Sequence, residues 1–368
     1  MFKHGGNIYR FSEEINIPEK KIIDFSASIN PLGVPEKVRH EINRHLSCLG
    51  NYPDPDTKAL RSKLARYHNL EPESILCGNG STELIYLIPR ALRPEKVLIP
   101  HPTFSEYERA CKISNELQVM RYELKKEDNF DIAPDEFISA IERLAFNSKL
   151  KTQNSKLVFL CNPNNPTGRL LKRHEVLEIA NAAAEMKCYL IVDEAFIDFC
   201  PEDSVIDAVQ SNPYLIVMRS MTKFYALSGL RVGYGVFPLN IIETIKKYKE
   251  PWTVNSLAQR AGLIALGDTG YRDKTIRLIK KEKQFLENNF KKIGIKFYPS
   301  EANFYLLKVN NADEIYLRLS KKGILVRDCS NFRGLDSSYI RVAVKPRADN
   351  LSLIKELTDI IKGGGEKI

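Results

Sequence analysis

Short runs of apolar residues alternate with longer, mixed stretches along the first two thirds of the chain. Four of these runs consist of aliphatic, β-branched and aromatic residues and predict strands at residues 97–99, 157–160, 189–192 and 215–218. The stretches between the runs have the length and pattern of helices. Because strands that alternate with helices form parallel sheets, this order predicts an α/β domain.

The pattern changes from about Trp252 onward. A long charged helix is predicted at residues 274–292, followed by strands at residues 304–309, 324–326 and 339–344. This order is typical of a smaller α+β domain. A chain of 368 residues also exceeds the size at which single hydrophobic cores stop growing. We therefore expect an N-terminal arm at residues 1–40, a large domain at 41–255 and a small C-terminal domain at 256–368.

The net charge of +9 raises the question of a nucleic-acid partner. The lysines, however, are spread through amphipathic segments such as residues 274–292, and no basic stretch is interleaved with aromatic residues. We interpret the charge as a solvated surface that also attracts a phosphorylated substrate, and expect no nucleic-acid partner. The absence of a long apolar run or a leader-like start predicts a cytoplasmic protein with no membrane partner. The seven dispersed cysteines and six scattered histidines predict no metal site.

One lysine and one aspartate follow two of the predicted strands. Lys223 ends the segment Ser220-Met221-Thr222-Lys223, and Asp193 precedes it by thirty residues. A lysine amine can form a Schiff base with an aldehyde, and a carboxylate can keep a pyridine nitrogen protonated. Since the carboxyl ends of parallel strands meet at one edge of the sheet, the pair indicates a pyridoxal-phosphate site.

Two further segments fit the same cofactor. The turn around Gly78 and Gly80 leads into an apolar-periodic helix, whose free N–H groups favour a phosphate. Position 83 is glutamate rather than a third glycine, so a dinucleotide-binding interpretation is weak. Arg231 follows Lys223 by eight residues and can bind the same phosphate. Asn165, held between prolines, can offer its side-chain amide to the ring oxygen.

Together, Asn165-Pro166-Thr167-Gly168, Asp193, Ser220 to Lys223 and Gly229-Leu230-Arg231 resemble the fold-type I pyridoxal-phosphate enzymes of the aminotransferase superfamily. The resemblance implies an aspartate aminotransferase-like fold, with a mainly parallel seven-stranded sheet in the large domain. Within the superfamily the chain resembles histidinol-phosphate aminotransferases and, more closely, the threonine-phosphate decarboxylases of cobalamin biosynthesis. The closer likeness spans nearly the whole chain, at residues 4–7, 24–33, 193–199, 251–255 and 334–339.

The resemblance implies roles for individual residues. Lys223 is the Schiff-base lysine and general acid or base, Asp193 the pyridinium partner and Asn165 the donor to the ring hydroxyl. Phe104 stacks on the ring, and Tyr52 reaches the cofactor of a neighbouring subunit, which implies a homodimer. The phosphate ligands are Gly80, Ser81, Thr82, Ser220, Thr222 and Arg231.

The resemblance also implies substrate contacts. Arg341 forks onto an α-carboxylate and Arg327 reaches a substrate phosphate, while His4, Asn30 and Asn165 are additional contacts. The implied reaction is the decarboxylation of O-phospho-L-threonine to (R)-1-amino-2-propanol O-2-phosphate. Phe196 stands where aminotransferases often have a tyrosine, a departure that weakens the aminotransferase interpretation. Motifs do not fix which bond at Cα stands perpendicular to the ring, so a phosphate-substrate aminotransferase remains the alternative.

Overall fold

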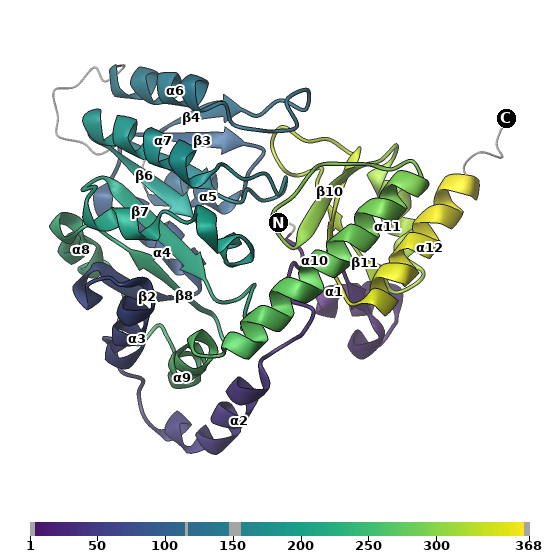
Figure 1. Cartoon of the computed structure of the whole chain (residues 1–368), viewed down its shortest axis with the longest axis horizontal. Coiled ribbons are helices and arrows are strands. Elements are labelled where there is room, and N and C mark those ends of the chain that lie inside the picture. The colour runs from purple at the N-terminus through teal and green to yellow at the C-terminus, as the bar shows by residue number, and fades with distance from the viewer. Residues whose placement is uncertain (1–3, 115–116, 147–155, 364–368) are drawn as a thin grey trace.

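The computed structural model describes residues 4–114, 117–146 and 156–363. A seven-stranded sheet forms the centre of the large domain, and its strands run parallel except for β8 (Figure 1). The predicted α/β fold with a mainly parallel sheet is therefore confirmed. In spatial order the strands are β2 (Ile75–Asn79), β8 (Val232–Val236), β7 (Leu215–Ser220), β6 (Cys188–Asp193), β5 (Lys156–Cys161), β3 (Lys96–His101) and β4 (Gln118–Glu123).

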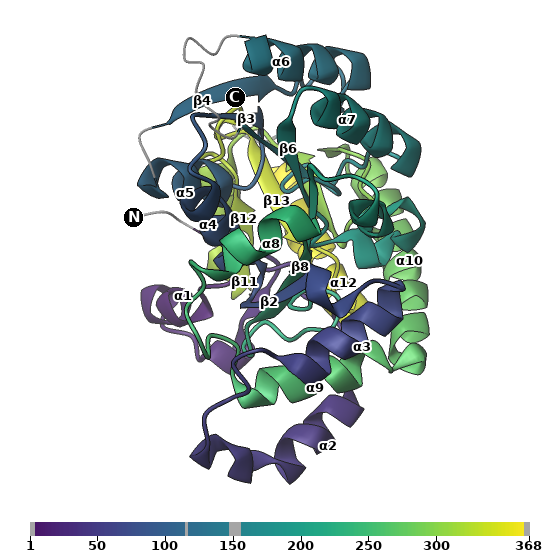
Figure 2. The same ribbon diagram turned by 90° about the vertical axis from the view of Figure 1, so that its left-hand side faces the viewer.

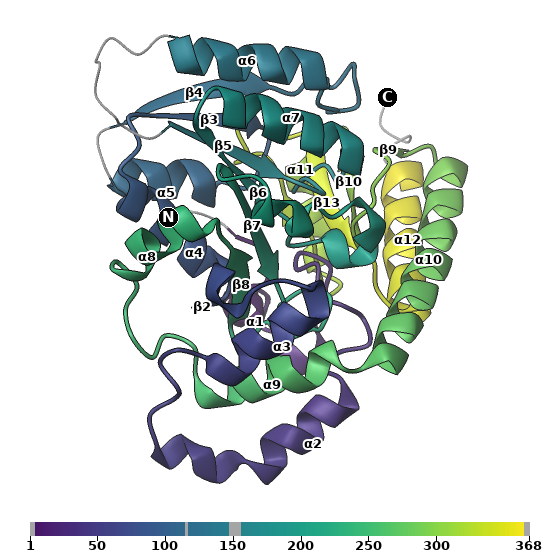
Figure 3. The ribbon, with the colours of Figure 1, turned by 60° about the vertical axis from the view of Figure 1, so that its left-hand side comes forward.

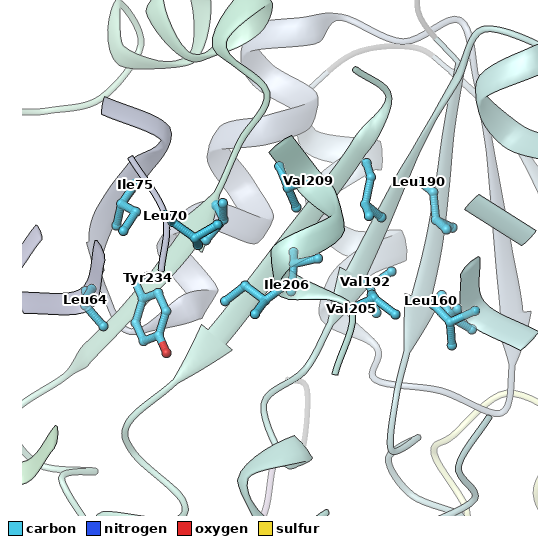
Figure 4. Close-up of a cluster of buried hydrophobic side chains, with 14 of the residues drawn as sticks. Leu64, Leu70, Ile75, Leu160, Leu190, Val192, Val205, Ile206, Val209 and Tyr234 are labelled. Carbon is cyan, nitrogen blue, oxygen red and sulfur yellow. The ribbon is translucent and has the colours of Figure 1, made fainter. Parts of the chain in front are cut away.

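Helices cover both faces of this sheet because alternate residues of each buried strand point to opposite sides. Leu190 and Val192 pack into one core together with Val205 and Ile206 (Figure 4), whereas Ile191 packs into the core on the other face. The large-domain helices are α3 (Lys58–His68), α4 (Ser81–Leu92), α5 (Glu106–Ser114), α6 (Pro134–Phe146), α7 (Arg173–Glu185) and α8 (Leu239–Lys246). Short 3-10 turns occur at Glu19–Lys21, Leu46–Gly50, Pro72–Ser74, Ile197–Phe199, Pro201–Asp203 and Ile206–Gln210.

The small domain contains a four-stranded antiparallel sheet with helices packed against it. The strands, in spatial order, are β12 (Arg327–Asp328), β13 (Tyr339–Ala343), β10 (Phe304–Lys308) and β9 (Lys296–Phe297). Helices α10 (Thr269–Lys292) and α12 (Arg347–Gly363) lie side by side (Figures 1 and 3), next to α11 (Ala312–Ser320). This is the α+β arrangement that the sequence pattern predicts.

The packing of α9 and of the N-terminal arm bears on the domain boundaries, which stay a prediction. Helix α9 (Ser256–Leu266) packs against α2 (Glu36–Arg44) and α3 at one end of the large domain (Figure 2), so the large-domain core extends beyond residue 255. The N-terminal arm contains α1 (Ile8–Ile15) and β1 (Ile23–Asp24), and β1 pairs with β11 (Ile324–Leu325) of the small domain. Hydrophobic periodicity marks a helix but does not say which core it enters.

Six of the thirteen strands that the structure describes lie outside the predicted strand segments, namely β1, β2, β4, β8, β9 and β12, and two of them show why. Strand β8 carries two glycines in five residues, and glycine weakens a strand pattern. Strand β4 lies at the sheet edge and mixes partly buried with exposed residues, with no fully buried position. Both are identified by their hydrogen-bonded partners rather than by their composition.

Candidate active site

Glycines bring three segments together at the carboxyl end of the sheet. A Cβ at Gly80 would lie 2.6 Å from Nη2 of Arg231, and a Cβ at Gly233 would lie 2.3 Å from the backbone nitrogen of Ser81. Neither position can therefore accept a larger residue without displacement. The N-terminus of α4, which begins at Ser81, thereby lies beside the Arg231 guanidinium.

The three segments form a cup lined by Ser81, Thr82, Ser220, Thr222 and Arg231. This cup has the hydrogen-bond donors that a phosphate needs. No side chain caps the N-terminus of α4, so its first N–H groups and the helix dipole are available to an anion. The hydroxyls of Ser220 and Thr222 lie 2.7 Å apart, and Arg231 uses Nη1 to donate to the Ser228 carbonyl at 3.0 Å. These residues fit the phosphate of the cofactor, as does Thr82 on the first turn of the helix.

Asp193 ends β6 and is only 3% exposed. Its Oδ2 accepts a hydrogen bond from the Tyr107 hydroxyl at 2.7 Å, and its Oδ1 accepts one from the Ala195 backbone at 3.1 Å. Burial raises the pKa of the carboxyl to about 6, against the effect of these two donors. A carboxylate held in this way can still accept a proton or a hydrogen bond from a basic nitrogen.

Lys223 lies partly buried in the loop after β7. Burial lowers the pKa of its amine to about 8, and the nearby guanidinium groups of Arg341 and Arg231 lower it further, while Asp193 opposes the shift. An amine must be neutral to attack an aldehyde, so this lowered pKa favours a covalent bond between Lys223 and the cofactor.

Arg341 is buried on β13 and contacts both domains. Its Nη1 donates to Oδ1 of Asn165, and its Nη2 donates to the Ser26 carbonyl at 2.8 Å. Its Nε is buried without a hydrogen-bond partner among the described residues, and the guanidinium carbon lies 5.0 Å from the ring centre of Phe304. Burial lowers the pKa of this group to about 10. An unpaired buried donor is costly, so the site favours an anion at this place.

Arg327 and His4 border a cavity of about 290 Å³ between the N-terminal arm and the small domain. Arg327 is buried and donates to the Asp328 carbonyl at 2.6 Å and to Oδ1 of Asn331 at 2.7 Å. His4 Nε2 lies 3.0 Å from Oε1 of Glu106, and its ring centre lies 6.1 Å from that of Phe104. The predicted phosphate arginine and the first residue of the described arm thus lie around one cavity.

Two residues of this site were not expected from the sequence. Tyr107 contacts Asp193, and its only signal in the sequence is its position three residues after Phe104. Arg10 of α1 lines the same cavity as Arg327. Nothing in the arm sequence distinguishes this arginine from the many exposed basic residues of the chain.

Asn30 has a different environment from the predicted one. It is 2% exposed, and its Nδ2 donates at 2.7 Å to both the Phe224 carbonyl and Thr275 Oγ1, while Oδ1 accepts from the Leu32 backbone at 3.0 Å. The backbone N–H of Asn30 donates to the Lys223 carbonyl at 3.0 Å. Because the amide is fully engaged within the protein, Asn30 holds the arm against the lysine loop, and the geometry does not support a substrate contact.

Tyr52 and Phe196 complete the set of predicted positions. Tyr52 is 83% exposed, and its ring centre lies 5.1 Å from that of Trp252 on the surface. Phe196 is buried and packs edge-on against Phe304 at 5.0 Å, so it offers no hydroxyl near Asn165. Within residues 4–114, 117–146 and 156–363, no group of three or more His, Cys, Asp or Glu side chains is arranged to hold a metal.

The fold and the site define a class of enzyme, and the similarity of this chain to known proteins supports the same class. The chain belongs to the family described as aminotransferase class I and II, whose sequence pattern matches residues 20–357. Enzymes of this family depend on pyridoxal phosphate, and this chain is a pyridoxal-phosphate enzyme of the same fold. Over the described residues, none of the helices is long and apolar enough to cross a membrane. The cytoplasmic location stays a prediction.

Three known proteins are particularly similar. Threonine-phosphate decarboxylase from Salmonella typhimurium (strain LT2) is 37% identical over 98% of this chain and 97% of its own length. Histidinol-phosphate aminotransferase from Thermoanaerobacter pseudethanolicus is 36% identical over 94% of each chain. The crystal structure of L-threonine-O-3-phosphate decarboxylase from Porphyromonas gingivalis aligns with a TM-score of 0.79 at 30% identity, covering 92% of this chain and 99% of that one.

Proposed function

We propose that this enzyme decarboxylates O-phospho-L-threonine to (R)-1-amino-2-propanol O-2-phosphate in cobalamin biosynthesis. The observation that carries the proposal is the pairing of Arg327 with Arg341. The two residues lie directly opposite each other on antiparallel strands β12 and β13, so their side chains leave the sheet on the same face. Two buried arginines on the same face of the sheet suit a small amino acid that has an anion at each end.

The residues described above would hold pyridoxal phosphate at three points. The cup formed by Ser81, Thr82, Ser220, Thr222 and Arg231 would bind its phosphate. Lys223 would bind its aldehyde carbon and Asp193 its pyridine nitrogen. Once bound, the cofactor supplies an electron sink for the electron pair left at the substrate Cα.

The arginines select and orient the substrate in this proposal. Arg341 binds the α-carboxylate, which satisfies its buried Nε, and Arg327 binds the phosphate in the cavity beneath the N-terminal arm. Together they fix the rotation about the Cα–N bond, and this rotation decides whether carbon dioxide or a proton leaves Cα. Lys223, with a pKa near neutrality, can then deliver a proton from Nζ to Cα.

The second candidate function is a histidinol-phosphate aminotransferase. It is supported by the similarity to the enzyme from Thermoanaerobacter pseudethanolicus. The same two arginines would bind the phosphate and carboxylate groups of its substrates. Phe196 argues against it, since a ring packed on Phe304 cannot supply the ring-oxygen hydrogen bond that many aminotransferases obtain from tyrosine.

We also propose that the enzyme is a homodimer in which Tyr52 completes the partner's site. A cavity of about 640 Å³ borders Thr82 and Arg231 and is lined by Thr253, the neighbour of Trp252. The exposed Tyr52 ring contacts Trp252 with the two planes tilted by 36°, so the tyrosine lies near the surface onto which this cavity opens. A two-fold interface requires such an arrangement, with the donor residue and its acceptor on one surface.

The deciding experiment offers the purified enzyme both sets of substrates. Incubation with O-phospho-L-threonine is expected to release carbon dioxide and the phosphorylated amino alcohol. Incubation with glutamate and imidazole-acetol phosphate tests amino transfer. Faster turnover of the second pair would replace the decarboxylase assignment with that of the aminotransferase.

A further inference from the structure

Tyr107 is a buried tyrosine that contacts the carboxylate assigned to the cofactor nitrogen. It lies on α5, is 1% exposed, and donates its hydroxyl to Asp193 Oδ2 at 2.7 Å. Its ring stacks on Phe159, with centres 4.9 Å apart and planes at 15°, and meets Phe104 edge-on at 5.7 Å. The two rings fix the direction of the hydroxyl, so the hydrogen bond is built into the site before any ligand binds.

Asp193 has few other groups to stabilise its charge. Tyr107 faces it from α5, Cys161 from β5, Glu194 from the next position of the chain and Lys223 from the loop after β7. Burial raises the pKa of the Cys161 thiol to about 12, so the thiol stays neutral, and the Glu194 charge disfavours a second anion. Burial, followed by the Asp193 charge, raises the pKa of the Tyr107 hydroxyl well above its ordinary value. Tyr107 is therefore a permanent donor.

We propose that Tyr107 is a positioning residue that keeps Asp193 anionic and aimed at the pyridine nitrogen of the cofactor. The inference rests on the role of Asp193 in the proposed function. Because Tyr107 and the Ala195 N–H each occupy one carboxylate oxygen, the lone pairs that remain define where a third donor can approach.

The hydroxyl decides where the shared proton resides. In a buried site, a pyridinium beside a carboxylate competes with a neutral pyridine beside a carboxylic acid, and the total number of protons is the same in both. A donor to the carboxylate stabilises the charged form. Loss of this one bond is expected to shift the ratio of the two forms toward the neutral pair by about tenfold or more.

The test uses the full-length enzyme loaded with pyridoxal phosphate that carries ¹⁵N in its ring. The nitrogen chemical shift reports the protonation of the ring directly and without turnover. Wild type is expected to give a pyridinium signal, and Tyr107→Phe a signal displaced toward neutral pyridine. The matched control is Tyr305→Phe, which also removes a buried tyrosine that donates to a carboxylate, Glu287, but in the small domain. The control is expected to keep the wild-type signal.

Asp193→Asn in the same series separates this inference from the site assignment. If Asp193→Asn loses the pyridinium signal and Tyr107→Phe keeps it, the role of Tyr107 is wrong while Asp193 keeps its own. If Asp193→Asn also keeps the signal, the assignment of Asp193 is wrong and the inference is overturned with it. Should Tyr107→Phe fail to fold, p-aminophenylalanine placed at position 107 is a weaker donor of nearly the same shape. It must move the signal toward neutral pyridine, and no movement would reject the proposal.

Discussion

Gly80 and Arg231 approach each other so closely that a single methyl group at position 80 would stand 2.6 Å from Nη2. Gly80 also has a φ of +74°, in the region that favours glycine. The arginine therefore reaches the N-terminus of α4 only because position 80 has no side chain. This relationship links a glycine of the β2–α4 turn to retention of the cofactor.

Gly80→Ala is expected to weaken pyridoxal-phosphate binding by about tenfold or more, because Arg231 must withdraw and lose a charge-assisted contact to the phosphate. The dissociation constant is measured by fluorescence titration of the protein freed of cofactor. Gly294→Ala is the matched control, since Gly294 has a similar φ of +72° but no atom within 4 Å of its Cβ position. Equal affinities of the two variants would show that the close approach of Gly80 and Arg231 does not control cofactor binding.

Lys223→Ala is expected to abolish the visible absorption band of the bound cofactor that borohydride removes. The physical reason is the loss of the amine whose lowered pKa lets it bond the aldehyde. Lys283→Met serves as the control, because Lys283 is another lysine whose pKa burial lowers, but it belongs to the small domain. A borohydride-sensitive band that persists in Lys223→Ala would assign the covalent bond to a different lysine.

Asp193→Asn is expected to lower turnover by about a hundredfold or more while leaving the fold intact, since the ring nitrogen loses its anionic partner.

The stability of the cofactor-free protein provides a second measurement on Asp193→Asn. The pKa of the folded carboxyl is raised to about 6, so its burial costs folding free energy that appears as pH rises from about 4 to 6. The full cost is on the order of 3 kcal/mol. The cofactor-free variant is therefore expected to be at least as stable as wild type at pH 7.5, with no gain at pH 4. A variant less stable at pH 7.5 would indicate that Asp193 has mainly a structural role.

Substitutions of Arg327 and of Arg341 are expected to weaken substrate binding in different ways. Arg341→Lys cannot reproduce the bidentate fork on a carboxylate and is expected to raise the KM for O-phospho-L-threonine by about tenfold or more. It is expected to weaken the binding of unphosphorylated threonine equally. Arg327→Met is expected to weaken binding of the phosphorylated compound alone. Steady-state kinetics and competition by threonine distinguish the two arginines, and identical profiles would contradict their separate roles.

The dimer proposal predicts complementation between two inactive variants. Tyr52→Ala lacks the residue given to the partner, and Lys223→Ala lacks the lysine of its own site. In a mixed dimer one site combines an intact Lys223 with an intact Tyr52, so unfolding and refolding the two variants together is expected to restore about a quarter of wild-type activity. An active monomer in light scattering, or no recovery after mixing, would contradict the shared site.

The strands that carry the site could be predicted because they are continuous apolar runs with polar residues at their carboxyl ends. Lys223 and Asp193 come together for this reason, although thirty residues separate them along the chain. Strand β8 could not be predicted in the same way because its glycines serve close packing against α4 rather than β propensity.

The hydrogen-bond partners of polar side chains are harder to predict from the sequence. Asn30 has the sequence context of a ligand-binding residue, but three hydrogen bonds within the protein engage its amide. Tyr107 has the context of an ordinary core residue, and only the fold places its hydroxyl on Asp193. The partner of a buried polar side chain often comes from a segment far away in the sequence. A single sequence does not show which distant segments lie close together in the fold.

The N-terminal arm connects parts of the enzyme that the domain division separates. Residues 23–30 pair with β11, accept the Nη2 bond of Arg341 through the Ser26 carbonyl, and bond the Lys223 loop through Asn30. A shortened protein that begins after residue 30 would lose an anchor of the carboxylate arginine and one of the lysine loop together. Deleting residues 1–30 would therefore affect the kinetics as the substitution of two active-site residues does, and a protein shortened at this end needs to be compared with the 368-residue chain.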